Sequence, residues 1–143
     1  MWVKQISVFL ENTSGRIAEV TGTLSEAGVN IRALAMADTA DFGVLRLIVD
    51  NTAKAEAALK AKGFTVGKTD VVAAEVEDRP GGLHRILQLL HEGQINVEYM
   101  YAFVQQSGNN AVMIFRFDQI EKAVALLRQN GVTVIDDDRI YQL

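Results

Sequence analysis

The stretch Asp78-Arg79-Pro80-Gly81-Gly82-Leu83 follows a short apolar strand pattern and opens a helical one. It has an earlier twin, Asn12-Thr13-Ser14-Gly15-Arg16-Ile17, in the same setting. Each helical run ends at a small-residue break and an Asn-aliphatic pair, Asn30-Ile31 in the first case and Asn96-Val97 in the second. We call the two strand-to-helix stretches elbow one and elbow two. The pattern predicts two copies of one structural unit.

The repeat extends beyond the elbows. Gly15 aligns with Gly81 at a shift of 66 positions. After the next strand the shift becomes 68, and residues 44–66 then match residues 112–134 at nine of 23 positions. Ordinary composition would give about one or two matches. The sequence therefore indicates an internal duplication.

The duplication predicts two units, residues 1–68 and 69–143, with almost no linker between them. The change of shift implies two extra residues in the second copy. Residues 105–110 are polar and contain glycine, which is typical of a turn, and we expect the insertion there.

Each copy predicts the order strand, helix, strand, strand, helix, strand. Alternating apolar residues predict the strands, and apolar residues three and four positions apart predict the helices. Gly63 and Gly131 are expected to end helices, since glycine accepts the left-handed conformation there. The expected core residues are Ile6, Val8, Leu10, Val20, Leu24, Leu45, Leu47 and Val49 in the first copy, and Val72, Ala74, Val76, Leu83, Ile86, Leu87, Leu90, Met113, Phe115 and Phe117 in the second; Ile17 belongs to the same helical stripe as Val20.

This βαββαβ order predicts an α+β fold of two ferredoxin-like units side by side. The second strand of such a unit lies at a sheet edge, and residues 96–104 are apolar on both faces. Because a free apolar edge invites aggregation, we expect this strand to pair with residues 30–37. The result would be an eight-stranded antiparallel sheet with four helices on one face. Residues 139–143 are expected as an extra strand.

The composition limits the classes to which this protein can belong. The 143 residues are 49% hydrophobic and 22% charged, with a formal net charge of -4 and no cysteine. An acidic chain without a Lys/Arg run argues against nucleic-acid and membrane-surface partners. No apolar run approaches the roughly 20 residues of a membrane helix, and no signal peptide is evident, so a cytoplasmic protein is expected. Units of about 70 residues gain stability from packing on one another, which favours a homodimer.

The elbows are candidate ligand-binding sites. The first turn of a helix carries N–H groups without partners and a positive dipole end, so a carboxylate or phosphate is stabilised there. Glycine at position 15 or 81 removes a side chain that would block close approach, and Pro80 suits the start of a helix. The alternative is that Asn12, Ser14 or Asp78 caps the helix. Asp78 is also a candidate partner for a ligand ammonium group.

Asn30 and Asn96 are candidates for the opposite wall of the site. An amide side chain can donate to a carboxylate and accept from an ammonium group. The alternative is a turn asparagine in the left-handed conformation.

The elbow, the helix and the Asn-aliphatic strand, repeated in βαββαβ units of this size, resemble the ACT domain, a regulatory module of amino-acid-controlled metabolic enzymes. The resemblance is close in the second copy and looser in the first, where Asn12 and Ser14 replace the acid and the proline. It implies a stand-alone tandem ACT protein in which an amino acid binds where two units meet. The site residues it implies are Asn12, Ser14, Gly15, Arg16 and Ile17, then Asp78, Pro80, Gly81, Gly82 and Leu83, with Asn30, Ile31, Asn96 and Val97 opposite.

Catalytic and metal-binding patterns are weak. His84 and His91 are seven positions apart, too far for a shared metal on one helix. Three consecutive acids, Asp136 to Asp138, cannot all face one ion on an extended chain, and a solvated turn is expected. Tyr99 and Tyr101 are expected to pack in an interface or to line a pocket. No catalytic triad or phosphate loop is found, so no catalytic residue, metal or cofactor is predicted.

The sequence thus favours a non-enzymatic amino-acid sensor that acts on a partner enzyme. Two alternatives remain at this point. One is a structural or regulatory subunit of a metabolic enzyme complex with no ligand of its own. The other is a small ferredoxin-like enzyme.

Overall fold

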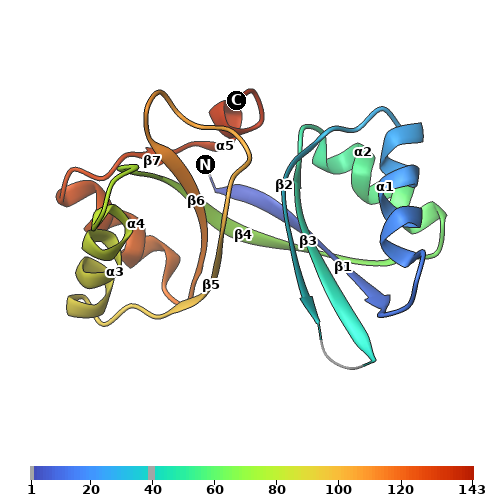
Figure 1. Ribbon diagram of the computed structural model, residues 1–143, viewed down its shortest axis with the longest axis horizontal. Coiled ribbons are helices and arrows are strands. Elements are labelled where there is room, and N and C mark those ends of the chain that lie inside the picture. Colours follow the sequence, from blue (N-terminus) through green and yellow to red (C-terminus); the bar gives the residue numbers. More distant parts are fainter. Residues whose placement is uncertain (1, 39–40) are drawn as a thin grey trace. The chain divides into compact units, whose positions relative to one another are not determined.

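The computed structural model describes residues 2–38 and 41–143 (Figure 1). These residues divide into two compact units, Lys4–Thr69 and Asp70–Leu143, and Trp2 and Val3 group with the second. The elements in chain order are β1 (Val3–Glu11), α1 (Arg16–Glu26), β2 (Ile31–Asp38), β3 (Phe42–Val49), α2 (Thr52–Ala61), β4 (Thr65–Val76), α3 (Gly82–Glu92), β5 (Val97–Ala102), β6 (Ala111–Phe117), α4 (Ile120–Gln129), β7 (Val134–Ile135) and α5 (Asp137–Ile140).

The first unit has the strand order β2-β3-β1-β4, with antiparallel pairing of β1 to β3 and of β2 to β3. Helices α1 and α2 cover one face of this sheet (Figure 1). The expected strand residues form the core between the sheet and the helices, because their alternation places them all on the covered face. The buried members are Ile6, Val8, Leu10, Val20, Leu24, Val29, Leu45, Leu47, Val49, Ala55, Leu59 and Phe64.

The second unit repeats this plan with the order β5-β6-β4-β7 and with α3 and α4 on one face (Figure 1). The strand register is conserved between the copies. Ile6 lies opposite Leu47 in the first unit, and their counterparts at shifts of 66 and 68, Val72 and Phe115, lie opposite each other in the second. Both units therefore have the ferredoxin-like strand order that the sequence predicts.

The prediction of an eight-stranded sheet is wrong. The described residues form seven strands, because the last strand of the first copy and the first strand of the second are one continuous strand, β4. Strands β2 and β5, which were expected to pair, stand at the two ends of the order β2-β3-β1-β4-β6-β5.

The prediction of four helices and a final strand is also wrong. Residues 137–140 form a fifth helix, α5, instead of an extra strand. Ile140 on this helix is fully buried, so the segment packs against the protein. The polar stretch 105–110 forms the expected turn, in which Ser107 and Asn110 exchange backbone hydrogen bonds and Gly108 has a φ of 60°.

The predicted helix ends are confirmed, whereas one predicted core residue is exposed. Gly63 and Gly131 follow the C-caps of α2 and α4 with φ of 87° and 77°, as predicted. Ile17 lies in the first turn of α1 and is 42% exposed, so its place in the apolar stripe does not make it a core residue. Within residues 2–38 and 41–143, no helix has the length and apolar character that crossing a bilayer requires.

Candidate functional site

Both elbows open onto helices whose N-termini lack a side-chain cap. The N-cap residues are Gly15 and Gly81, in the left-handed conformation with φ of 89° and 85°, and neither end has a side-chain capping hydrogen bond. Helix α2 differs, since the Asn51 side chain accepts a hydrogen bond from the Lys54 N–H at 3.1 Å. The N-cap position is therefore a glycine in both elbows, and not Asn12, Ser14 or Asp78.

The two elbows share one backbone geometry. The Thr13 N–H donates to the Glu11 carbonyl at 2.9 Å, and Arg79 repeats this bond to Glu77 at 2.9 Å. A second turn bond joins residues 16 and 13 in elbow one and residues 82 and 79 in elbow two. In the part of the chain that the structure describes, the backbone N–H groups of residues 17–18 and 83–84 have no protein acceptor. These groups are available to an anion.

The glycines of the elbows serve different purposes. A Cβ on Gly15 or Gly81 would meet no atom within 4 Å, so these two residues are required by their positive φ. A Cβ on Gly82 would lie 2.0 Å from the carbonyl oxygen of Glu77, so the tight turn of elbow two requires glycine there. Elbow one has Arg16 at that position. The elbows thus share their turn hydrogen bonds, and they differ in chemistry and in how closely the chain approaches the preceding strand at this position.

Arg16 brings a cation to elbow one. Its guanidinium group lies 4.9 Å from the centre of the Phe64 ring, in cation–π geometry. Its Nη1 pairs with Glu19 at 2.7 Å. At elbow two the nearest cation, Arg79, pairs with Glu77 on the surface. Pro80 and Leu83 flank Gly81 and Gly82, and Leu83 packs partly against the second core.

Asn30 and Asn96 are exposed residues that begin β2 and β5. The left-handed position in each copy is two residues earlier, at Gly28 with φ of 72° and at Gln94 with φ of 58°. The alternative of a left-handed turn asparagine is therefore wrong. Ile31 and Val97, the aliphatic partners, are half-buried against the first and second cores.

Each asparagine lies at the far end of the helix from the elbow of its own unit. Helix α1 has 11 residues, which is about 16 Å at 1.5 Å per residue. One small ligand cannot span that length. An elbow and an asparagine can therefore meet on one ligand only if they come from different units, and the composite site stays a prediction.

The Asn30 end of the first unit is hollowed. An open depression of about 380 Å³ there is lined by Thr21, Ser25, Gly28, Val29, Asn30 and Ile31. Its lining combines backbone, hydroxyl and amide groups with aliphatic carbon.

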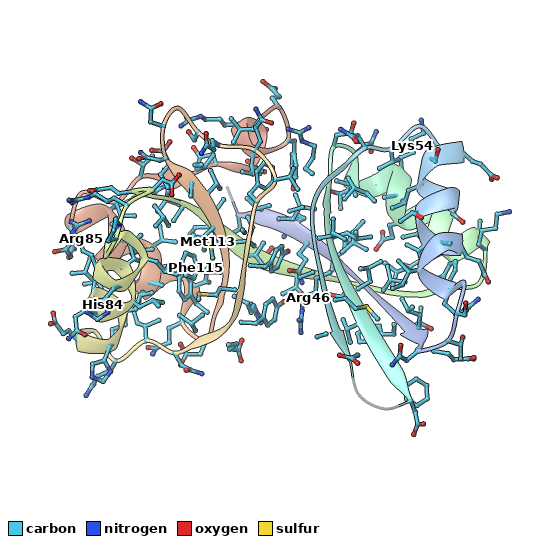
Figure 2. All side chains as sticks on the ribbon, viewed as in Figure 1. Arg46, Lys54, His84, Arg85, Met113 and Phe115 are labelled. Atoms are coloured by element: carbon cyan, nitrogen blue, oxygen red, sulfur yellow. The ribbon has the colours of Figure 1, made fainter. Side chains whose placement is uncertain are left out.

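The histidine, acidic and tyrosine candidates lie on α3, at the start of α5 and on β5. His84 and Arg85 both lie on α3 (Figure 2). Arg85 Nη2 donates to the Asn130 carbonyl at 2.7 Å. No cluster of three or more His, Cys, Asp or Glu side chains suited to a metal ion occurs in the described residues. Asp136 is the N-cap residue of α5, and Asp137 and Asp138 lie in its first turn. Tyr99 and Tyr101 are half-buried and alternate with exposed residues on β5.

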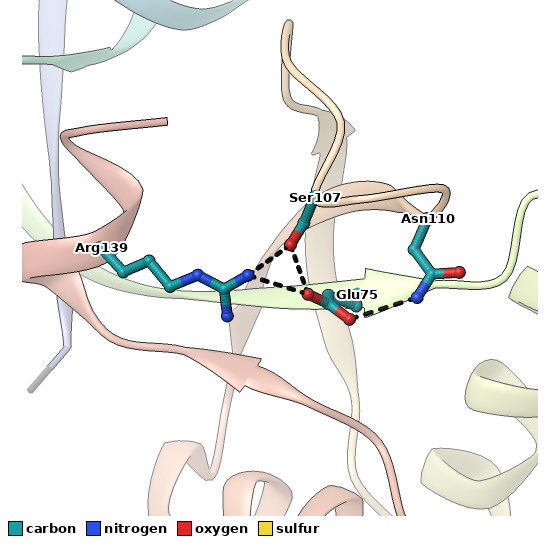
Figure 3. Close-up of polar contacts among 4 residues, drawn as sticks. All are labelled: Glu75, Ser107, Asn110 and Arg139. Carbon is teal, nitrogen blue, oxygen red and sulfur yellow. Dashed lines mark hydrogen bonds and ion pairs between the residues drawn. The ribbon is translucent and has the colours of Figure 1, made fainter.

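The second unit contains a polar network centred on Glu75, which the sequence does not predict (Figure 3). The Ser107 hydroxyl donates to the Glu75 carboxylate. Asn110 Nδ2 donates to the same carboxylate at 3.2 Å, and Arg139 Nη2 contacts Glu75 at 3.4 Å and Ser107 Oγ at 2.6 Å. No sequence signal joins residues so far apart.

The network perturbs the titration of Glu75. The hydrogen bond from Ser107 contributes most to holding the pKa of Glu75 below its ordinary value of 4.5. Burial opposes this shift, and Asn110 and Arg139 reinforce it. The carboxylate is therefore ionised at neutral pH and fixes Arg139 against the sheet.

Comparisons with known proteins agree with this architecture. A family described as the ACT domain pair matches residues 1–143. A crystal structure of a protein from Bacteroides thetaiotaomicron superimposes with a TM-score of 0.93 at 39% identity, over 100% of this chain and 98% of that one. No curated protein matches the chain.

More distant structures share the fold. The ligand-free regulatory subunit of aspartate kinase from Thermus thermophilus has a TM-score of 0.62 at 18% identity, covering 90% of this chain and 92% of that one. The corresponding subunit from Thermus flavus has a TM-score of 0.61 at 15% identity, covering 88% and 90%.

Proposed function

The chain belongs to the ACT domain pair family, and on that premise we propose that it is a non-catalytic regulatory protein that binds a free amino acid between two ACT units and acts allosterically on a partner enzyme. The observation that carries this proposal is the pair of helix N-termini with glycine N-caps and no side-chain cap. A duplicated, uncapped helix start leaves N–H donors unused in both copies, and a carboxylate is the ligand group that satisfies them.

In the proposed site the α-carboxylate binds the N–H groups of an elbow. The ammonium group binds an asparagine side chain from another unit or, at elbow two, Asp78. The residues proposed for elbow one are Asn12, Ser14, Gly15, Arg16 and Ile17, those for elbow two are Asp78, Pro80, Gly81, Gly82 and Leu83, and those of the facing strands are Asn30, Ile31, Asn96 and Val97.

Regulation follows from ligand binding between units. A ligand that contacts two units favours the packing in which both contacts are made, and it shifts the equilibrium only by its differential affinity. Coupling of about 1–3 kcal/mol is the usual scale. Two regulatory subunits of aspartate kinase share this fold, which supports a metabolic enzyme as the partner. We expect the protein to act as a cytoplasmic homodimer.

The chemistry of the sheets supports a non-catalytic role. The residues that face away from the helices include Ser7, Phe9 and Arg46 in the first unit and Arg116 in the second. Arg116 pairs with Glu98 at 3.3 Å and donates to the Asp70 carbonyl at 3.2 Å. These groups supply cations and apolar surface but no convergent general base.

A thermal-shift screen against the twenty amino acids tests the proposal. A ligand at 100 times its Kd stabilises the fold by about 2.7 kcal/mol. We expect one class of amino acid to raise Tm, and we expect Gly15→Val or Gly81→Val to reduce that shift. Gly108→Val is the matched control, because Gly108 also has a positive φ but lies in the turn 105–110. No shift with any amino acid would favour a structural subunit without a ligand.

A further inference from the structure

The first unit contains a pocket of about 310 Å³ beside elbow one. It lies where β1 ends, β3 begins and the turn after α2 enters β4. Its lining includes Phe9, Glu11, Arg16, Phe42, Phe64 and Thr65. All of these residues belong to one unit, so the pocket needs no contact from another.

The second unit has a twin of this pocket with different chemistry. Its volume is only about 100 Å³, and its lining includes Glu75, Glu77, Gly82, Asn110, Val132 and Thr133. At the shifts of 66 and 68 positions, these six residues are the counterparts of the six named for the first pocket. The duplication has therefore produced one aromatic pocket and one small polar pocket.

The network of Glu75 explains why the twin is small. Glu75 and Asn110 replace Phe9 and Phe42, and they hydrogen-bond to each other at 3.2 Å (Figure 3). Ser107, from the turn that carries the two extra residues, and Arg139, from α5, complete the network. The first copy has no counterpart of α5. In the second copy the polar groups therefore hydrogen-bond to one another.

Several side chains that line the pocket of the first unit are exposed. Phe9 is 50% exposed and Phe42 is 64% exposed. The Nε of Arg16 is buried and has no hydrogen-bond partner among the described residues. Glu11 adds an exposed carboxylate to the same lining. The pocket therefore presents an apolar wall, a cation and an anion.

We propose that this pocket takes an α-amino acid with an aromatic or branched apolar side chain, and that its twin in the second unit takes no ligand. The apolar side chain packs on Phe9 and Phe42, the ammonium group pairs with Glu11, and Arg16 adds a cation beside the elbow N–H groups that bind the carboxylate. Ligand pockets have volumes of roughly 300 Å³ or more, which the first pocket reaches and the twin does not. The inference rests on the proposed function for the general class of ligand and adds the side chain that is selected and the copy that selects it.

Calorimetric titration of the full chain tests this inference. L-phenylalanine and L-leucine are compared with L-alanine, which lacks the large apolar group, and with 3-phenylpropionate, which lacks the ammonium group. We expect L-phenylalanine or L-leucine to bind with one site per chain and to exceed L-alanine by roughly tenfold in affinity, the usual scale for a few methylene groups in an apolar pocket. We expect 3-phenylpropionate to bind more weakly than L-phenylalanine.

Two variants locate the site, and a third serves as the control. Phe42→Ser and Arg16→Met should each weaken binding by about tenfold, which corresponds to about 1.4 kcal/mol. Leu34→Ser is the matched control, since Leu34 is a 49% exposed apolar residue of β2 that does not line the pocket. It should leave the affinity unchanged.

The outcomes separate this inference from the proposed function. If an amino acid binds but Phe42→Ser and Leu34→Ser behave alike, the pocket is not the site and the proposed function stands. If polar amino acids bind as well as apolar ones, the selected side chain is wrong. If no amino acid binds, both proposals fail. If Phe42→Ser changes the oligomeric state and not the affinity, the pocket is a contact between copies of the chain and the inference is overturned.

Discussion

The carboxylate of Asp50 accepts a hydrogen bond from the backbone N–H of Asn30 at 3.0 Å, and the Asp50 N–H donates back to the Asn30 carbonyl at 3.1 Å. Asp118 and Asn96 repeat this pair in the second unit, at 3.1 and 3.3 Å. Each asparagine is therefore fixed through its backbone, and its side chain is left exposed. The pair sets where β2 and β5 begin.

Removal of the Asp50 or Asp118 carboxylate should destabilise the fold. We expect Asp50→Ala or Asp118→Ala to lower the free energy of unfolding by about 1–3 kcal/mol, the cost of losing a charged acceptor. Asp50→Asn keeps an acceptor oxygen and should lower the free energy of unfolding less than Asp50→Ala does. Urea unfolding measures all three. Equal losses for Asp50→Asn and Asp50→Ala would show that the charge, and not the hydrogen bond, is what matters.

Alanine at the two glycines of elbow two should have unequal effects. Gly81→Ala adds a Cβ to open space in a left-handed conformation, and we expect a loss of about 1 kcal/mol. Gly82→Ala places a Cβ against the Glu77 carbonyl, so the backbone must shift and the loss should be larger. Denaturant unfolding of both variants compares them. Gly15→Ala in elbow one is the reference for Gly81→Ala, because Gly15 has nearly the same φ.

The Glu75 network should make stability depend on pH. The pKa of Glu75 is lower in the folded protein than its ordinary value of 4.5, so the folded state holds this proton less tightly than the unfolded state. The stabilisation is complete above pH 4.5 and is lost as the pH falls through the lowered pKa. Glu75→Gln should therefore cost about 1–3 kcal/mol at pH 7.

The same variant should converge with the natural chain in acid. Unfolding curves recorded from pH 7 down to pH 3 measure the difference between the two proteins. Ser107→Ala serves as a second probe, since the Ser107 hydroxyl makes the largest contribution to the shift. A difference that stays constant across this range would contradict the role of the ionised carboxylate.

Helix α5 should depend on a single buried side chain. Ile140 is fully buried although its helix has only four residues. We expect Ile140→Ala to cost about 2–4 kcal/mol and to increase hydrogen exchange in residues 136–143. Val104→Ala, at a 62% exposed position, should change stability little. Protected amides in the segment of the Ile140 variant would show that the Glu75 network suffices to hold it.

Local patterns predicted much of the fold because their physical causes are local. The alternation of Ile6, Val8 and Leu10 places them on one face of a strand whatever lies elsewhere in the chain. Glycine at 63 and 131 marks helix ends because a left-handed φ favours glycine. At the elbows, the sequence predicted where the helices begin. It left open whether a side chain caps them, because capping depends on a side-chain orientation that the pattern does not contain.

The errors have long-range causes. Strand β4 could be split or continuous with the same residues, and only the pairing partners on either side decide between the two. Residues 139–143 fit a strand by pattern, but residues 137–140 form a helix in which Ile140 is buried. Glu75 gave no signal because its partners Ser107, Asn110 and Arg139 are 32, 35 and 64 positions away.

The sequence by itself determined the duplication, the strand and helix order and the glycine elbows, since backbone preference and side-chain periodicity act over a few neighbouring residues. Only the tertiary structure decided that the two equivalent pockets differ in size and chemistry. Phe9 and Phe42 are far apart in the chain, as are Glu75 and Asn110, and they meet only once β1 lies beside β3 and β4 beside β6. Pocket chemistry depends on side chains that meet in space, and sequence spacing does not encode that meeting.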